Sequence, residues 1–348
     1  MDSIVTIKNL YKIFGPNPQK ALELVQDGVG KDELLEKTGH VLGLSDINLE
    51  MPRNQIQVIM GLSGSGKSTL IRHINRLIEP TTGEIIIDNI NVLGMNKNEL
   101  RDLRRHKISM VFQKFALFPH RTVIENVSFG LNIQGLKGDD VRTRAERWIS
   151  RVGLSGYEDY YPAQLSGGMQ QRVGLARALT TDADILLMDE AFSALDPLIR
   201  TEMQDILLDL QEELHKSIVF ITHDLDEALR IGDNIAILRD GMIIQTDDPQ
   251  NILMKPADAY VADFMKDINR ARVLRVRAIM HADDPSVEGP SMSGATTLEQ
   301  ALQFFAENNV EHAVIHNRSN QRVGVLSIAD LIRGMKRPTI EEIQAEHA

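Results

Sequence analysis

The chain has 348 residues, of which 43% are hydrophobic and 25% charged, a composition typical of a globular protein with about two domains. Its formal net charge of -11 argues against a general nucleic-acid binder, because such proteins carry a strongly basic surface. The chain contains no cysteine, which excludes disulfides, thiolate catalysis and cysteine-ligated zinc.

Neither a secretory signal nor a membrane span is expected from the sequence. The first residues lack a basic region followed by an apolar core. The longest apolar runs, such as residues 185–188, are far shorter than the ~20 residues that cross a bilayer. We therefore expect any role at a membrane to depend on a partner protein.

The first fifty residues predict two strands separated by a helical insertion. Alternating polar and apolar residues predict strands at 3–8 and 44–50. Between them, the Asn-Pro pair at 17–18 predicts the start of one helix, and a second short helix is expected at 31–37. We interpret residues 16–43 as an insertion within this pair of strands.

From residue 55 onward strands alternate with helices, which predicts a mostly parallel sheet covered on both faces. The expected strands are residues 55–60, 107–112, 184–188, 217–221, 234–238 and 242–245. The expected helices are residues 67–78, 123–131, 140–152, 167–180, 197–215 and 224–230. Together with residues 1–54 they are assigned to one domain, residues 1–268.

A second, smaller module is predicted beyond residue 268. Four arginines at 270, 272, 275 and 277 crowd a segment, 269–278, that we interpret as a solvated linker, with a lipid-headgroup contact as the alternative. The module itself is assigned to residues 279–336, and the polar tail 337–348 is expected to fray. Its expected helices are 297–308 and 328–335, and its expected strands are 313–316 and 322–327.

The sequence GLSGSGKS at residues 61–68 matches GxxxxGK[ST] between a predicted strand and a predicted helix. In this pattern the glycines let the backbone wrap phosphates, and amides at the helix N-terminus point at the anion. Lys67 adds a positive charge on the phosphates, and Ser68 offers a hydroxyl ligand to Mg²⁺. The candidate ATP-binding residues here are Gly61, Ser63, Gly64, Ser65, Gly66, Lys67, Ser68 and Thr69.

Two carboxylates, Asp189 and Glu190, directly follow the apolar run 185–188. The end of such a buried strand presents Asp189 near the metal, and Glu190 can orient and polarise an attacking water. Adjacent carboxylates are usually solvated, so the buried strand before them is what favours the catalytic interpretation.

The sequence LSGGMQ at residues 165–170 resembles the signature motif of the ABC ATPase family. In that family a helix N-terminus bearing Ser and Gly contacts the γ-phosphate bound to the other subunit, which implies this role for Ser166 and Gly168. The resemblance also implies the fold class, α/β. The expected P-loop NTPase domain has a RecA-like core, an antiparallel β subdomain and a helical subdomain.

Further residues match this family in order along the chain. Gln113 resembles the glutamine that senses Mg²⁺ and contacts the membrane partner, and with Ser68 and Asp189 it forms the implied metal set. Residues 193–196 resemble the D-loop, which ends at Asp196. His223 resembles the switch histidine that contacts the γ-phosphate, and Phe14 the aromatic ring that stacks on adenine. The alternatives are a structural histidine and a core aromatic.

Five stretches of the sequence are similar to the ATP-binding subunit of bacterial glycine betaine/proline osmoprotectant importers. They are residues 17–21, 35–39, 59–63, 75–80 and 191–203. This resemblance implies an ATPase that energises uptake through a separate integral membrane permease, with a substrate-binding protein as an indirect partner. It implies a homodimer that sandwiches two ATP molecules, peripheral on the cytoplasmic face of the bacterial inner membrane, with no nucleic acid partner. The alternatives are a trimethylamine N-oxide, choline or carnitine importer, or a soluble non-transport ABC ATPase.

Three stretches near the end of the sequence together resemble a CBS motif: residues 297–302, 312–315 and 323–330. Members of the importer family often carry two such motifs in tandem, whereas this chain has room for one. Sensing of ionic strength or of an adenine nucleotide is one hypothesis for this module. A packing and dimerisation role is the alternative, and a nucleotide-sensing switch with a vestigial motor is disfavoured because the motor motifs are intact.

Overall fold

The computed structural model describes residues 2–113, 115–193, 195–317 and 319–336. Its contacts divide the chain into two compact units, Met1–Ile243 and Ile244–Ala348. The predicted tail, 337–348, lies outside the described residues. No helix in the described ranges is both long enough and apolar enough to span a membrane.

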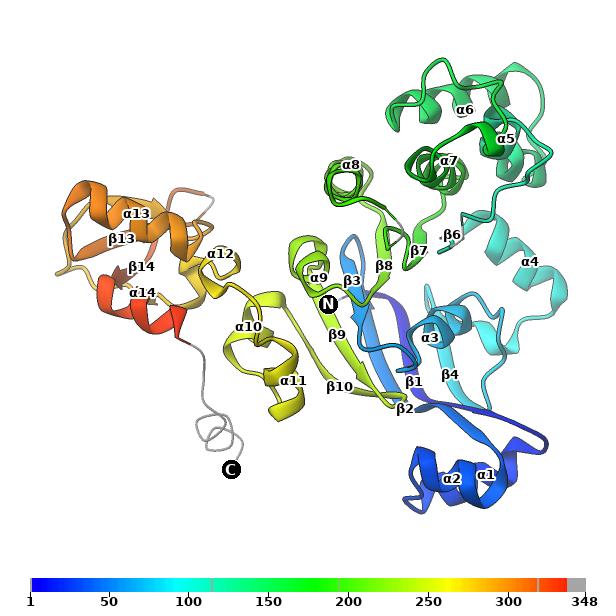
Figure 1. Cartoon of the computed structure of the whole chain (residues 1–348), viewed down its shortest axis with the longest axis horizontal. Helices are drawn as coiled ribbons and strands as arrows, with labels where there is room; N and C mark the ends of the chain where they lie inside the picture. The colour runs from blue at the N-terminus through cyan, green and yellow to red at the C-terminus, as the bar shows by residue number, and fades with distance from the viewer. Residues whose placement is uncertain (1, 114, 194, 318, 337–348) are drawn as a thin grey trace. The chain divides into compact units, whose positions relative to one another are not determined.

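Residues 3–247 form two sheets (Figure 1). The antiparallel sheet has the order β2-β1-β4-β5, formed by β1 (Ser3–Phe14), β2 (Val41–Pro52), β4 (Thr82–Ile87) and β5 (Ile90–Asn91). The six-stranded sheet has the order β10-β9-β3-β8-β7-β6, formed by β3 (Ile56–Met60), β6 (Ile108–Val111), β7 (Ile185–Asp189), β8 (Ser217–Thr222), β9 (Asn234–Arg239) and β10 (Met242–Asp247). Strands β6, β7, β8, β3 and β9 run parallel, as predicted, so their carboxyl ends meet at one edge.

Helix α3 (Lys67–Ile74) belongs to the main core of the first unit. Its apolar residues Leu70, Ile71 and Ile74 join side chains of both sheets in one buried cluster. Strands β3, β7 and β8 are buried at every position, which requires helices on both faces of their sheet. This packing fixes the start of α3 beside the ends of the parallel strands.

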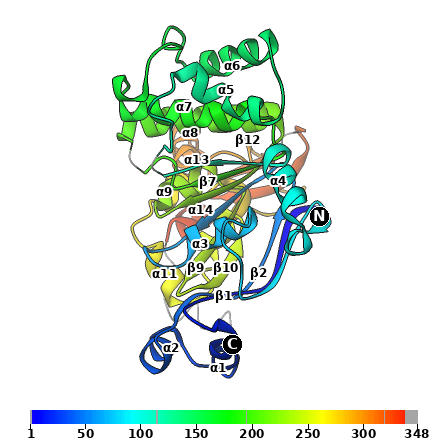
Figure 2. The same cartoon turned by 90° about the vertical axis from the view of Figure 1, so that its right-hand side faces the viewer.

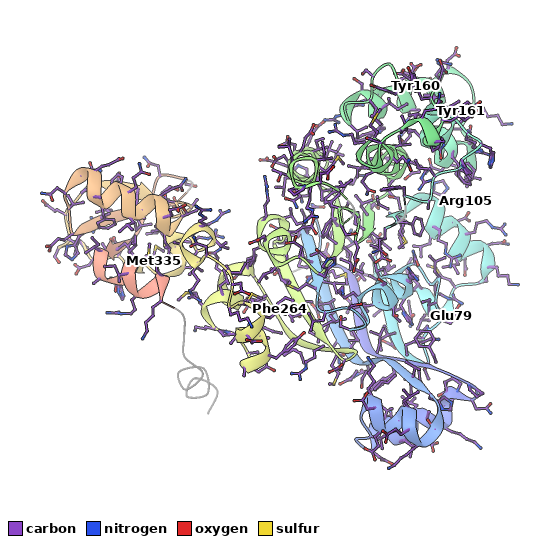
Figure 3. All side chains as sticks on the ribbon, viewed as in Figure 1. Glu79, Arg105, Tyr160, Tyr161, Phe264 and Met335 are labelled. Atoms are coloured by element: carbon purple, nitrogen blue, oxygen red, sulfur yellow. The ribbon has the colours of Figure 1, made fainter. Side chains whose placement is uncertain are left out.

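The other helices of the first unit form two groups and a few single elements. They are α1 (Pro18–Gln26), α2 (Lys31–Thr38), α4 (Lys97–His106), α5 (Val123–Ile133), α6 (Asp139–Arg151), α7 (Gly167–Thr180), α8 (Pro197–Leu214) and α9 (Leu225–Ile231), with short turns η1 (Val92–Gly94) and η2 (Pro162–Gln164). Figures 1 and 2 show α5–α7 gathered at one end of the unit and α1–α2 at the other. The exposed side chains of Tyr160 and Tyr161 lie at the α5–α7 end (Figure 3).

Most predicted elements are present, but several ends differ. Strands β1 and β2 are longer than predicted because their antiparallel pairing continues as far as Phe14 and Val41, next to the insertion that joins them. Helix α3 ends at Ile74 instead of residue 78, since Arg76 adopts a left-handed backbone with a φ of 55°. Helix α4 was not predicted.

The second unit carries its own four-stranded sheet, in the order β11-β14-β13-β12. Its elements are α10 (Pro249–Met254), α11 (Ala259–Phe264), α12 (Arg270–Val273), η3 (Val276–Ala278), β11 (His281–Ala282), β12 (Ser291–Ser293), α13 (Leu298–Asn308), β13 (His312–His316), β14 (Arg322–Ser327) and α14 (Ile328–Met335). The buried Arg270 donates to the carbonyls of Leu253 and Gly334, which ties α10 to α14. The compact units thus divide between Ile243 and Ile244, and the predicted domain boundary at residue 268 stays a prediction.

Candidate functional site

The loop between β3 and α3 is shaped by glycines with positive φ. Gly61, Gly64 and Gly66 have φ values of 153°, 78° and 107°. A Cβ on Gly61 would lie 2.2 Å from the carbonyl oxygen of Leu238, and one on Gly66 would lie 2.8 Å from that of Gly43. Only glycine fits these two positions, so the loop packs tightly on its neighbours directly before the start of α3.

Lys67 places a positive charge beneath this loop. Its side chain is buried, and Nζ donates to the carbonyl oxygens of Gly61 at 2.8 Å and Leu62 at 3.0 Å. The same Nζ lies 3.9 Å from Oε1 of Glu190. Burial lowers the pKa of Lys67, while the charges of Glu190 and Asp189 oppose this shift.

Asp189 lies at the end of β7 with its carboxylate directed at α3. It is 2% exposed, and Oδ1 accepts a hydrogen bond from Ser68 Oγ at 2.8 Å. Its other oxygen, Oδ2, accepts from Arg72 at 3.2 Å. The predicted pair of oxygen ligands, Ser68 and Asp189, is therefore brought together by α3 and β7.

Glu190 is held by both its backbone and its side chain. Its φ of 46° is unusual for a residue other than glycine, and its amide donates to the carbonyl of Ile221 at 3.1 Å. Oε2 accepts from Gln113 Nε2 at 2.8 Å and lies 3.6 Å from Nδ1 of His223. The three predicted catalytic residues, Glu190, Gln113 and His223, follow three different strands and therefore meet.

A cleft of about 400 Å³ opens above this cluster. Its lining includes Phe14, Lys31, Val41, Leu42, Gly43, Ser63, Gly64, Gly66, Lys67, Ser68, Thr69, Gln113 and Glu190. The ring of Phe14 is 39% exposed and rests against the backbone of Gly43, where an added Cβ would lie 2.7 Å from Cε2. Gly61, Ser65 and Asp189 are not among the lining residues. Gly61 packs on Ser65, since a Cβ on Gly61 would lie 2.8 Å from the buried hydroxyl of Ser65.

The predicted residues Ser166, Gly168 and Asp196 lie elsewhere, around a second cavity of about 420 Å³. Ser166 caps α7, and its Oγ accepts a hydrogen bond from the amide of Met169 at 3.3 Å. Within the part of the chain that the structure describes, the two cavities share no lining residue. Of the predicted D-loop, Ala194 lies outside the described residues.

Four polar residues at the two cavities were not predicted from the sequence. Lys31 lines the first cavity, and Arg72 pairs with Asp189 beneath it. Tyr157 and Arg172 line the second cavity. None of the four belongs to a local motif, so only the folded structure reveals them.

Comparison with known proteins agrees with this arrangement. The pattern that defines the ABC transporter family matches residues 44–193. The glycine betaine/proline betaine transport system ATP-binding protein ProV of Escherichia coli K12 is 48% identical over 327 residues, which cover 93% of this chain and 81% of ProV. The chain belongs to the ABC transporter family of ATP-binding proteins.

Two further relatives support this membership. The glycine betaine transport ATP-binding protein OpuAA of Bacillus subtilis is 55% identical over 79% of this chain, which spans 66% of the length of OpuAA. The solved structure of the ATP-binding cassette MJ0796 in a dimeric post-hydrolysis state, bound to ADP and phosphate, matches with a TM-score of 0.61 and 34% identity. That match covers 70% of this chain and 98% of the cassette. The predicted ABC ATPase fold and the predicted family are confirmed.

Proposed function

We propose that this ABC ATPase uses ATP hydrolysis to drive uptake of a compatible solute of the glycine betaine/proline type through a separate membrane permease. The observation that supports the ATPase role most is the meeting of Lys67, Glu190 and Gln113 at one cleft. The similarity to ProV and OpuAA supports the solute class.

The chemistry follows from what each side chain offers. The loop amides and Lys67 bind the β- and γ-phosphates, because both present positive charge to an anion. Glu190 accepts a proton from the attacking water, and Gln113 and His223 hold its carboxylate in position. His223 contacts the γ-phosphate as the Pγ–O bond to ADP breaks. Phe14 stacks on the adenine through its exposed ring.

Mg²⁺ fits the oxygen atoms that this part of the site offers. Ser68 Oγ and Asp189 Oδ1 are 2.8 Å apart, and Gln113 lines the same cleft. Within the described ranges, no group of three or more His, Asp or Glu side chains is arranged to bind a metal alone. Mg²⁺ in nucleotide sites uses one or two protein oxygens together with phosphate oxygens, and it neutralises phosphate charge. Ser68, Asp189 and Gln113 are the residues proposed to hold it.

Each chain carries two unlike halves of a site, which is why the active form is a homodimer. The Lys67 half binds ATP, and the Ser166 half of a second chain covers the γ-phosphate with the N-terminus of α7. Two chains therefore enclose two ATP molecules. Closure of the dimer drives the permease. To move the equilibrium between the open and closed dimers from 1:99 to 99:1, ATP must bind the closed dimer more tightly by about 5.5 kcal/mol.

The remaining partners follow from the importer role. The ATPase docks on integral membrane permease subunits at the cytoplasmic face of the bacterial inner membrane, and a substrate-binding protein delivers the solute. The alternative cargoes are trimethylamine N-oxide, choline and carnitine. The second unit, which resembles a single CBS motif, is proposed to sense ionic strength or an adenine nucleotide, with dimerisation as the alternative.

Reconstitution tests the proposal. The ATPase is purified with its permease, and hydrolysis is measured with its substrate-binding protein and each candidate solute in turn. We expect stimulation by glycine betaine or proline betaine. Basal hydrolysis that no compatible solute stimulates would contradict the importer assignment, and absence of hydrolysis would contradict the ATPase assignment.

A further inference from the structure

The insertion between β1 and β2 supplies a cation to the nucleotide cleft. Lys31, the first residue of α2, lines the cleft together with Phe14 and the residues of the glycine loop. Its Nζ donates to the carbonyl oxygen of Gly64 at 3.3 Å, across 33 positions in the sequence. The lysine therefore stands where the loop faces the open cleft.

Helix α2 is anchored to the first unit, so the backbone position of Lys31 is fixed. Leu34, one turn further along α2, is 0% exposed and packs with Leu22 and Val25 of α1 and with Leu42 of β2. At the other end of the helix, Thr38 Oγ1 donates to the carbonyl of Leu34 at 2.6 Å. The side chain of Lys31 takes no part in this small core, so it is free to follow a ligand.

The charge of Lys31 has no anionic partner within the described residues. The other lysine of α2, Lys37, pairs with Glu33 at 2.5 Å, whereas no described carboxylate lies within 4.0 Å of Lys31. Among the described residues, the one hydrogen bond of its ammonium group is to a neutral carbonyl, at the longer distance of 3.3 Å. Replacing that carbonyl with a phosphate oxygen would form a shorter, charge-assisted hydrogen bond, and the flexible lysine stem permits the movement.

We infer that Lys31 binds the phosphate chain of the bound nucleotide, so that the insertion forms one wall of the ATP site. This inference rests on the proposed function, because it requires ATP in the cleft between Phe14 and the glycine loop. The insertion then contributes directly to nucleotide affinity. The same position makes its contribution sensitive to salt, since Lys31 is only partly buried.

Calorimetric titration of the purified full-length chain with Mg-ATP tests the inference. We compare wild type with Lys31→Met, Lys31→Arg and the matched control Lys37→Met, which lies on the same helix but outside the cleft lining. We expect Lys31→Met to weaken ATP binding about five- to tenfold at low salt, as expected for one charge-assisted hydrogen bond. Lys31→Arg restores most of the affinity, and Lys37→Met leaves it unchanged.

Salt dependence separates a charge contact from a change in packing. The difference between wild type and Lys31→Met should shrink at high salt, because screening removes the attraction that the variant lacks. Equal ATP affinity of wild type and Lys31→Met overturns the inference and leaves the proposed function intact. A loss that is equal at all salt concentrations, or that Lys37→Met shares, also overturns it. Failure of wild type to bind ATP overturns the proposed function itself.

Discussion

Replacing Glu190 with glutamine separates ATP binding from ATP hydrolysis. The substitution keeps the size of the side chain, and the amide oxygen still accepts from Gln113 Nε2, which donates to Glu190 at 2.8 Å. What is lost is the negative charge that accepts the proton of the attacking water. General base catalysis contributes about 10²- to 10⁴-fold, so we expect kcat to fall by that factor. Lys67 loses a carboxylate at 3.9 Å, which lowers its pKa further, but Asp189 remains to oppose the shift.

The assay measures two quantities on the same protein. Steady-state hydrolysis by the permease complex gives kcat, and titration of the isolated chain gives the affinity for ATP. We expect Glu190→Gln to bind ATP within about threefold of wild type, because the phosphate-binding loop and Lys67 are untouched. The exposed Glu212 on α8 provides the matched control, Glu212→Gln, which should not change kcat. Turnover by Glu190→Gln within about threefold of wild type would refute the assignment of the general base.

Three further substitutions test the surroundings of the site. Phe14→Ala should weaken ATP binding by about 1–3 kcal/mol if the ring stacks on adenine, and unchanged affinity in a titration would contradict this. Gly66→Ala forces a φ of 107° on alanine and a Cβ at 2.8 Å from Gly43 O, so urea unfolding should show a loss of about 2–4 kcal/mol. His73→Met removes a wholly buried histidine whose pKa is lowered chiefly by burial. Wild type should therefore lose stability as pH falls below about 6.5, because the unfolded chain binds a proton first, and the variant should lose less. An equal loss of unfolding free energy in wild type and His73→Met between pH 7.5 and 5.5 would contradict the role of His73.

Much of the site was predictable because each motif adjoins its own strand or helix. Lys67 begins the helix after β3, and Glu190 directly follows β7. In a parallel sheet the carboxyl ends of neighbouring strands meet at one edge, so these residues converge without any long-range information. The same reasoning brings Gln113 and His223, which follow β6 and β8, to the cluster.

Other features depend on packing or on signals other than apolar periodicity. Helix α4 has only two apolar residues, Leu100 and Leu103, which pack on the main core one turn apart. This apolar stripe is short, so the clearest sequence signal of the helix is the capping box formed by Asn96 and Glu99. Lys31 and Arg72 reach the site through contacts across 33 and 117 positions of the sequence, respectively. No local pattern specifies such contacts, because they depend on how an insertion and a helix face pack on the sheets.

Complementation between two inactive variants tests most directly whether each site is completed by a second chain. Lys67→Ala removes the phosphate-binding charge from one half, and Ser166→Arg fills the second cavity of the other half. In a mixed dimer one site carries both lesions and the other carries none. We predict that each variant alone is inactive and that mixing the two restores hydrolysis. With random pairing, about half of the dimers are mixed and each has one intact site, so about a quarter of all sites should be active. A mixture no more active than either variant alone would contradict the two-chain site.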